Sequence, residues 1–226
     1  MSSLILQRAV VIIGASGHAR VCLDIITAQG VNVLGFFDDD ENLRGSTLHD
    51  HNILGDTKSA VAYIKNEDVD VFIAIGDNYT RKKIASIIKS ELKYPLINAV
   101  HPSTIISSHS SMGHGNFIAP GVIINTDTKL GSYVILNTGA TIDHDNHIHD
   151  FAQMSPGCNL SGNVTVEEGA FLGTGAVVIP GKTIGSYAIV GAGAVVIDDI
   201  PPFSTAVGVP ARVIKQNIQT DTFLSG

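Results

Sequence analysis

Aliphatic residues recur at every sixth position over the second half of the chain. The series runs through sixteen successive hexads without a break. Its members are Ile106, Met112, Ile118, Ile124, Leu130, Leu136, Ile142, Ile148, Met154, Leu160, Val166, Leu172, Val178, Ile184, Val190 and Val196. A period of six fits neither an amphipathic helix nor an alternating strand, but it suits a coil whose short sides each send one aliphatic residue inward. The pattern predicts a parallel β-helix in which three hexads form one triangular coil.

Small residues occupy two further positions of the hexad, which is counted from the periodic aliphatic residue as its first position. The position after the aliphatic residue often holds Gly or Asn, as at Gly113 and Asn125. The fifth position often holds Ala, Val or Cys, as at Ala140 and Cys158. Because small and turn-forming residues let a chain bend sharply, we expect them to form the corners of the coil.

The first hundred residues show a different pattern, in which short apolar runs alternate with helical periodicity. The runs that read as strands are Ala9–Ile13, Val31–Phe37, Val69–Ile75 and Leu96–Val100. A helical segment follows the first run, and others lie near Thr57–Asn66 and Tyr79–Lys93. Strands that alternate with helices predict a parallel sheet covered on both faces. We expect a small Rossmann-like α/β domain over residues 1–100 and an all-β helix domain with a C-terminal cap over residues 101–226.

Polar clusters follow three of the expected strands, where parallel sheets bind ligands. They are Gly14-Ala15-Ser16-Gly17-His18, Asp38-Asp39-Asp40 and Gly76-Asp77-Asn78. A glycine turn at a helix N-terminus offers free N–H groups to a phosphate, and a carboxylate at Asp38 suits a ribose hydroxyl or a base N–H. A purely structural turn and a solvated acidic loop are the alternatives. The domain is short for two nucleotide-binding halves, so a nucleotide-sugar suits it better than NAD.

Composition excludes several other classes. A net charge of −7 argues against a nucleic-acid partner. No apolar run approaches the roughly 20 residues that span a bilayer, and the N-terminus does not resemble an export signal, so we expect a cytoplasmic protein without membrane insertion. Cys22 and Cys158 suit reduced core positions better than a disulfide or a metal site.

The three polar motifs, joined to a hexapeptide β-helix, resemble the nucleotide-sugar N-acetyltransferases of the hexapeptide-repeat acyltransferase superfamily. Members include the UDP-4-amino-sugar acetyltransferases of bacillosamine synthesis, and sialic acid O-acetyltransferases are relatives. The resemblance implies a left-handed coil, a homotrimer with active sites between subunits, and acetyl-CoA as co-substrate. The residues that it places against the nucleotide-sugar are Ser16, Gly17, His18, Asp38, Asp39 and Gly76.

His144 matches the catalytic histidine of this family. A histidine with a pKa near 6.5 can accept the proton that an attacking amine must lose. Asp145, or Asp143, could orient the imidazole, and the resemblance places Asn137 near the reacting amine. His144 also stands in a column with Gly162, one coil of 18 residues away, where packing does not require a histidine. The alternative is an ordinary surface histidine.

The resemblance places acetyl-CoA along the outside of the β-helix. The residues expected to contact it are Gln153, Thr174 and Ala192. The family has a histidine where this chain has Gln153. Gly162 would let the pantetheine approach the backbone closely, although glycine is equally expected at a coil corner.

These observations predict an acetyl-CoA-dependent N-acetyltransferase that acts directly, without an acyl-enzyme, on the 4-amino group of a UDP-linked 4-amino-4,6-dideoxy sugar. The alternatives are sialic acid O-acetylation and a non-catalytic trimeric scaffold of a sugar pathway. A zinc hydratase of the same fold would use His144, His147 and His149. However, Ser108 and Gly113 occupy the positions where a third ligand would stack, so we expect no metal.

Overall fold

The computed structural model describes residues 8–92 and 96–216. The chain divides into two compact units, Met1–Pro102 and Ser103–Gly226. Lys93, with which the third expected helix ends, lies outside the described residues. None of the helices found in the described part is long and apolar enough to cross a membrane.

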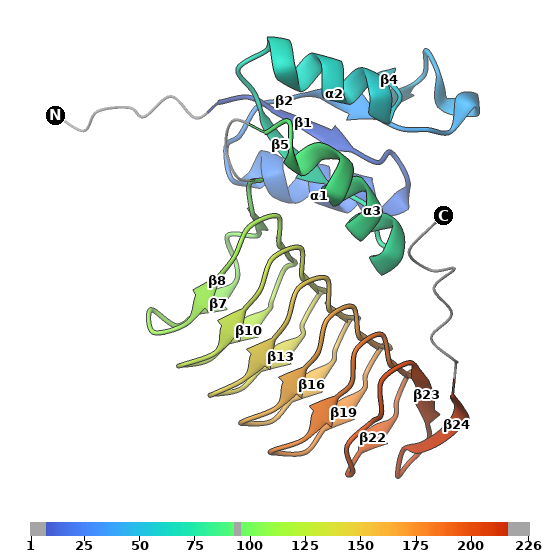
Figure 1. Ribbon diagram of the computed structural model, residues 1–226. Coiled ribbons are helices and arrows are strands. Elements are labelled where there is room, and N and C mark those ends of the chain that lie inside the picture. Colours follow the sequence, from blue (N-terminus) through green and yellow to red (C-terminus); the bar gives the residue numbers. More distant parts are fainter. Residues whose placement is uncertain (1–7, 93–95, 217–226) are drawn as a thin grey trace, which may run out of the picture. The chain divides into compact units, whose positions relative to one another are not determined.

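A sheet with the strand order β3-β4-β2-β1-β5 forms the centre of the first unit. Its strands are β1 (Val10–Ile13), β2 (Val33–Phe37), β3 (Thr47–Leu48), β4 (His51–Gly55) and β5 (Asp70–Ile73). The helices are α1 (Gly17–Ala28), α2 (Thr57–Asn66) and α3 (Asn78–Lys89), with a short 3-10 helix η1 (Glu41–Leu43) after β2. β1 pairs in parallel with β2 and β5, and β2 pairs in parallel with β4. Figure 1 shows α2 on one side of the sheet and α1 and α3 on the other, which confirms the expected α/β architecture.

The prediction that Leu96–Val100 forms the fourth strand of this sheet is wrong. The short strand β6 (Ala99–Val100) does not belong to the sheet, and β4 takes the fourth parallel position. Of the five residues of β4 only Ile53 is buried. The segment therefore lacks the continuous apolar run by which the other parallel strands are recognised.

The second unit is a left-handed parallel β-helix, as predicted. Its first face consists of β7 (Ile105–Ile106), β10 (Ile123–Ile124), β13 (Thr141–Ile142), β16 (Asn159–Leu160), β19 (Val177–Val178) and β22 (Val195–Val196). Its second face consists of β8 (Ser111–Met112), β11 (Lys129–Leu130), β14 (His147–Ile148), β17 (Thr165–Val166) and β20 (Thr183–Ile184). Its third face includes β9 (Phe117–Ile118), β12 (Ile135–Leu136), β15 (Gln153–Met154), β18 (Phe171–Leu172) and β21 (Ile189–Val190). Figure 1 shows the coils stacked from green to red.

The interior of the β-helix is filled from two positions of each hexad. The periodic aliphatic residues are buried from Ile118 onward, and Ile106 and Met112 in the first coil are half-buried. The fifth position is also buried apart from Ser110 and Lys182, and Val122, Ala140 and Cys158 are fully enclosed there. The small residues at this position therefore line the core, where two side chains per side leave little room.

The bend of each side occurs at the third and fourth hexad positions. From Gly115 to Gly193 every residue at the fourth position has positive φ; eight of these fourteen residues are glycine, and Asp145, with φ 58°, is one of the six that are not. Glycine at the second position serves a different purpose. At Gly173, a Cβ would lie 2.6 Å from the backbone nitrogen of Ala192 in the next coil. The small residue there permits close stacking of coils.

An antiparallel pair follows the last coil. β23 (Ser204–Val207) continues the third face by pairing in parallel with β21, and β24 (Arg212–Gln216) pairs with β23 in the antiparallel direction. The Val209–Pro210 bond between them is cis.

Candidate active site

The loops after β1, β2 and β5 enclose a cavity of about 370 Å³ at the carboxyl ends of the strands. Ser16, Asp38, Asp39 and Gly76 line it, so four of the six residues expected to bind the nucleotide-sugar come together. Gly17 and His18 are not among the lining residues. Gly14 lies in the left-handed region with φ 101°, and a Cβ there would lie 2.7 Å from the carbonyl oxygen of Ala74. Glycine is therefore required where the β1 loop passes the β5 loop.

The two aspartates that end β2 hold neighbouring loops in place. One carboxylate oxygen of Asp38 accepts the N–H of Ala15 at 2.6 Å, and the other accepts the N–H of Asp40 at 2.9 Å. Asp39 accepts the N–H of Thr57 at 2.8 Å and its hydroxyl at 3.0 Å. These bonds contradict the picture of a loop that is merely solvated.

Arg81 of α3 is a functional candidate that sequence reasoning missed. Its side chain is 1% exposed and donates to the carbonyls of Ile75 and Gly76 at 2.9 and 3.0 Å. It also donates to the side chain of Asn78 at 2.8 Å. A buried guanidinium thus fixes the loop that follows β5. The available signal was the apolar stripe of α3, because Arg81 lies three and seven residues before the buried Ile84 and Ile88.

His18 at the start of α1 is an uncharged imidazole. Burial, and secondarily the positive charge of Arg81, lower the pKa of His18 to about 4. Near neutral pH it therefore presents one N–H and one lone pair rather than a cation. Cys22 lies one turn further along α1, and burial raises the pKa of its thiol.

His144 and Asp145 form the two-residue turn between β13 and β14. The Nδ1 atom of His144 lies 2.7 Å from a carboxylate oxygen of Asp145, and both side chains are more than half exposed. This hydrogen bond is the main reason that the pKa of His144 lies above its ordinary value, and the charges of Asp143 and Asp145 act in the same direction. With Nδ1 occupied by a carboxylate, Nε2 is the atom that can accept a proton.

Asp143 holds the backbone of the same turn. Its carboxylate accepts the N–H of His144 at 2.8 Å and the side-chain amide of Asn125 at 3.0 Å. These two bonds, that from Asn125 first, lower the pKa of Asp143. The two aspartates that flank the histidine therefore have different tasks, since Asp145 meets the ring and Asp143 meets the main chain.

Asn146 fastens this turn to the core. Its side chain is fully buried, donates to the carbonyls of Asp143 and Ser161 at 2.6 and 3.1 Å, and accepts the N–H of Val164 at 2.9 Å. It occupies the fifth hexad position, where most coil sides have a small apolar residue and where Asn116 and Thr128 are also buried polar residues. The catalytic candidate therefore stands on a corner that is tied to the following coil.

Gly162 lies directly against the imidazole of His144. A Cβ built on it would fall 2.4 Å from Cε1 and 2.5 Å from Nε2 of that ring. Any side chain at position 162 would therefore push the imidazole of His144 out of its place. The structure thus gives Gly162 a contact that sequence reasoning did not foresee, beside the expected contact with acetyl-CoA.

The remaining candidates lie at another edge of the β-helix. The histidine edge joins the first and second faces and includes residues 143–146 and 161–164. The second edge joins the third and first faces and includes residues 137–140, 155–158, 173–176 and 191–194. Asn137, Thr174 and Ala192 stand on the second edge, and Gln153 precedes it on β15. One chain therefore brings Gly162 to His144, but it does not bring Asn137 or the other expected acetyl-CoA contacts there.

Metal and thiol chemistry receive no support from the described residues. Among them, no three His, Cys, Asp or Glu side chains are grouped as a metal ion would need. The thiol of Cys158 is buried and donates to the carbonyl of Gly173 at 3.0 Å. Burial raises the pKa of Cys158, which disfavours a thiolate nucleophile.

Known proteins resemble the chain along most of its length. Residues 9–88 match the family model described as the PglD N-terminal domain. A histidine-to-alanine mutant of GDP-perosamine N-acetyltransferase from Caulobacter crescentus, solved with CoA and GDP-perosamine, is 38% identical with a TM-score of 0.87. The match covers 92% of this chain and 97% of that one. The acetyltransferase domain of PglB from Neisseria gonorrhoeae, solved with acetyl coenzyme A, is 32% identical with a TM-score of 0.85, and the match covers 92% and 100% of the two chains.

An uncharacterized protein of Acanthamoeba polyphaga mimivirus is 31% identical over 108 residues. That match spans 48% of this chain and only 20% of the viral protein. The two solved structures, in contrast, agree with this chain over both of its units. The chain therefore belongs to the hexapeptide-repeat acyltransferases that acetylate nucleotide-linked amino sugars with acetyl-CoA.

Proposed function

We propose that the protein transfers the acetyl group of acetyl-CoA to the 4-amino group of a nucleotide-linked 4-amino-4,6-dideoxy sugar, and that His144 is the general base. The observation that carries this proposal is the exposed His144–Asp145 pair on an edge of the β-helix. The cavity at the ends of β1, β2 and β5 supports a nucleotide-linked substrate. UDP remains our expectation for the nucleotide, and the similarity to the GDP-perosamine enzyme makes GDP the second candidate.

The proposed reaction is a direct transfer. The amine nitrogen attacks the thioester carbonyl, a C–N bond forms, and Nε2 of His144 takes the proton that the amine releases. The C–S bond then breaks, and the proton passes from His144 to the thiolate of CoA. Asp145 stabilises the imidazolium that exists between these steps through its 2.7 Å contact with Nδ1. This route uses neither cysteine.

We further propose that the functional site lies between subunits of a homotrimer. His144 stands on the histidine edge, whereas Asn137, Thr174 and Ala192 stand on the second edge. Two edges of one triangular coil cannot meet, but the histidine edge of one subunit can meet the second edge of its neighbour under rotational symmetry. The solved relatives with CoA or acetyl coenzyme A support acetyl-CoA as the donor.

Free-thiol release from acetyl-CoA tests the proposal. The acceptors are UDP-, GDP- and dTDP-linked 4-amino sugars and free sialic acid. We expect turnover with one of the nucleotide amino-sugars. We expect His144→Ala to lower kcat by about 10²–10⁴-fold, the usual contribution of a general base, with unchanged affinity for the nucleotide. His147→Ala, an exposed histidine on the adjacent strand, is the matched control.

The other functions give different results in this assay. Turnover with sialic acid alone would reassign the protein to O-acetylation. Absence of thiol release with every acceptor would favour the scaffold function. Near wild-type turnover by His144→Ala, with the control also active, would remove His144 from the mechanism while leaving the activity in place.

A further inference from the structure

Many corners of the β-helix are closed by a backbone hydrogen bond. In these corners the N–H of the fifth hexad position donates to the carbonyl of the second position, three residues before it. Ala140 donates to Asn137 in this way at 3.0 Å, and Ala176 donates to Gly173 at 3.0 Å. This is the bond from the fourth residue to the first that is typical of a β-turn.

The corner that carries His144 is closed by a side chain instead. The N–H of Asn146 donates to the hydroxyl of Thr128 at 3.3 Å, and the same hydroxyl donates to the carbonyl of Asp143 at 2.7 Å. Thr128 belongs to the preceding coil, 18 residues before Asn146. One hydroxyl group therefore links the two ends of the turn in which His144 lies.

Asn146 repeats this arrangement one coil further on. Its side-chain oxygen accepts the N–H of Val164 at 2.9 Å, and its amide donates to the carbonyl of Ser161 at 3.1 Å. The corner that it closes contains Gly162, which lies against the imidazole of His144. Thr128 and Asn146 thus close the two corners that meet at the ring.

The burial of Thr128 makes these bonds difficult to replace. Its side chain is fully enclosed, and a buried N–H that loses its partner is destabilising. Without the hydroxyl, the partner available to the N–H of Asn146 is the carbonyl of Asp143, as in the other corners. Formation of that bond would move the two residues between them, which are His144 and Asp145.

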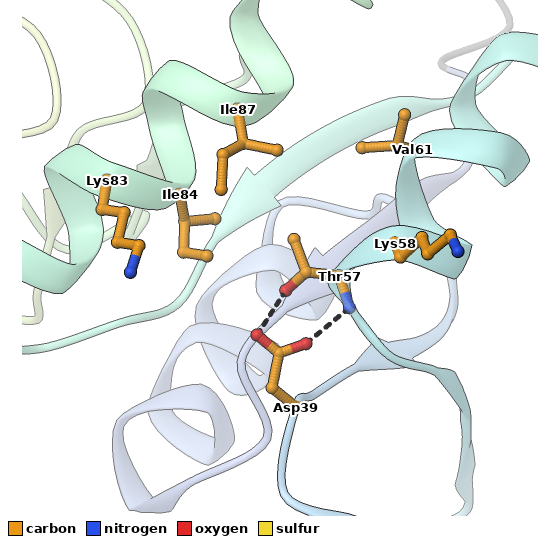
Figure 2. Close-up of a pocket in the computed structure, with 7 residues that line it drawn as sticks. All are labelled: Asp39, Thr57, Lys58, Val61, Lys83, Ile84 and Ile87. Atoms are coloured by element: carbon orange, nitrogen blue, oxygen red, sulfur yellow. Dashed lines mark hydrogen bonds between the residues drawn. The ribbon is translucent and has the colours of Figure 1, made fainter. Parts of the chain in front are cut away.

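Threonine has a comparable task at the cleft of the first unit. Figure 2 shows Thr57, at the start of α2, with its N–H and its hydroxyl both bound to the carboxylate of Asp39. Asp39 lines the cleft, so a candidate site residue is held there by a threonine of another segment. In the β-helix the threonine acts on the main chain rather than on a carboxylate.

We propose that Thr128 is a positioning residue of the acetyl transfer, which holds the imidazole of His144 between Asp145 and Gly162 by closing its turn from the preceding coil. Thr128 is too deeply buried to meet a substrate, and it acts through the main chain of Asp143 and Asn146. The proposal rests on the proposed role of His144 as the general base.

Steady-state kinetics of Thr128→Val and Thr128→Ser test the proposal. Valine keeps the shape of threonine but removes the donor and the acceptor, so we expect kcat to fall about tenfold or more with unchanged KM values for both substrates. Serine retains the hydroxyl and should keep most of the wild-type kcat. Near wild-type kcat in Thr128→Val would overturn the proposal, and so would equal losses in the two variants.

Asn116→Ala is the matched control. Asn116 closes the corner of residues 131–134 in the same manner, since its side chain accepts the N–H of Val134 at 2.7 Å and donates to the carbonyl of Gly131 at 3.0 Å. That corner carries no catalytic candidate. We expect Asn116→Ala to lower the midpoint of urea unfolding but to keep kcat. A fall in kcat as large as that of Thr128→Val would attribute the loss to general loosening of the coils and overturn the proposal.

The pKa of His144, followed by NMR of labelled histidine, gives a measurement that does not depend on turnover. The hydrogen bond with Asp145 is the main cause that raises this pKa, and the charges of Asp143 and Asp145 act in the same direction. Displacement of the turn in Thr128→Val should lower the pKa toward the ordinary value of about 6.5, whereas Thr128→Ser and Asn116→Ala should leave it raised. A pKa that stays raised in Thr128→Val would overturn the proposal.

Two further outcomes are covered by these measurements. If Thr128→Val does not fold, Thr128→Cys keeps a weak donor, and we expect a smaller fall in both kcat and the pKa of His144. Wild-type values of both in that variant would overturn the proposal. Absence of thiol release by the wild-type protein would refute the acetyltransferase, while the NMR measurement would still decide whether Thr128 positions His144.

Discussion

His144 is held from two directions. Asp145 meets Nδ1 at 2.7 Å, and the backbone of Gly162 in the next coil lies against the ring. The carboxylate of Asp145 raises the pKa of the imidazole, whereas Gly162 leaves room for the ring. Substitutions at the two positions therefore change different measurable properties of one reaction.

Asp145→Asn should move the pH profile of kcat. A general base works in its neutral form, so a raised pKa of His144 shifts the acid limb of the profile upward. Loss of the negative charge at position 145 should return the limb toward the ordinary histidine value of about 6.5 and lower kcat. Rate measurements from pH 5 to 9 at saturating acetyl-CoA test this expectation. If the acid limb of the profile did not move, a group other than His144 would be responsible for the pH dependence of kcat.

Gly162→Ala should lower kcat, because the new methyl group would displace the ring. A loss of about tenfold or more corresponds to misplacement of a catalytic group by a fraction of an ångström to an ångström. The same variant tests the expected contact of Gly162 with the donor. A rise in KM for acetyl-CoA without a fall in kcat would assign the residue to donor binding rather than to the seating of His144.

At the scale of elements, the corner that carries His144 depends on the buried polar side chain of Asn146. Asn146→Ala would leave the carbonyls of Asp143 and Ser161 and the N–H of Val164 without this partner. We expect a destabilisation on the order of 3 kcal/mol, since each buried group that is left unsatisfied costs about 1–3 kcal/mol. Urea unfolding measures the change, with the exposed Asn52→Ala as control. A change below half of that value would show that water or relaxation replaces the bonds.

The hexad period determined how much of the fold could be predicted. The aliphatic column identifies the inward positions, and three sides per coil follow from it. The α/β sheet was less accessible, because β4 buries only Ile53 and leaves no apolar run to find. A strand is recognised from its sequence only when its burial leaves a pattern.

The candidate site was predictable as a set of residue types but not as a set of contacts. Sequence placed Ser16, Asp38, Asp39 and Gly76 at strand ends, and the structure gathers them around one cavity. It gave no role to Arg81, since a buried guanidinium that binds loop carbonyls follows no short motif. The contact between Gly162 and His144 crosses 18 positions and depends on the ring conformation. Whether the predicted residues bind substrate stays a prediction.

For the whole molecule, the separation of the two edges leads to a complementation experiment. His144→Ala inactivates the histidine edge of a subunit, and Ala192→Arg, at an exposed corner, should block acetyl-CoA at the second edge. If each site combines edges from two subunits, co-expression of the two inactive variants in equal amounts should restore about a quarter of the sites. Trimers that contain one variant only are the control. Absence of recovery in verified mixed trimers would place a complete site within one chain.

The stacked coils also have a consequence for how such an enzyme can change its acyl donor. Groups along the histidine edge are spaced by whole coils, and parallel strands lie about 4.8 Å apart. The distance between the base and any residue above or below it can therefore change only in steps of that size. The length of acyl chain that the site accepts would therefore change in steps of one coil, and a side chain two coils away from His144, such as that of Pro180, would set the limit.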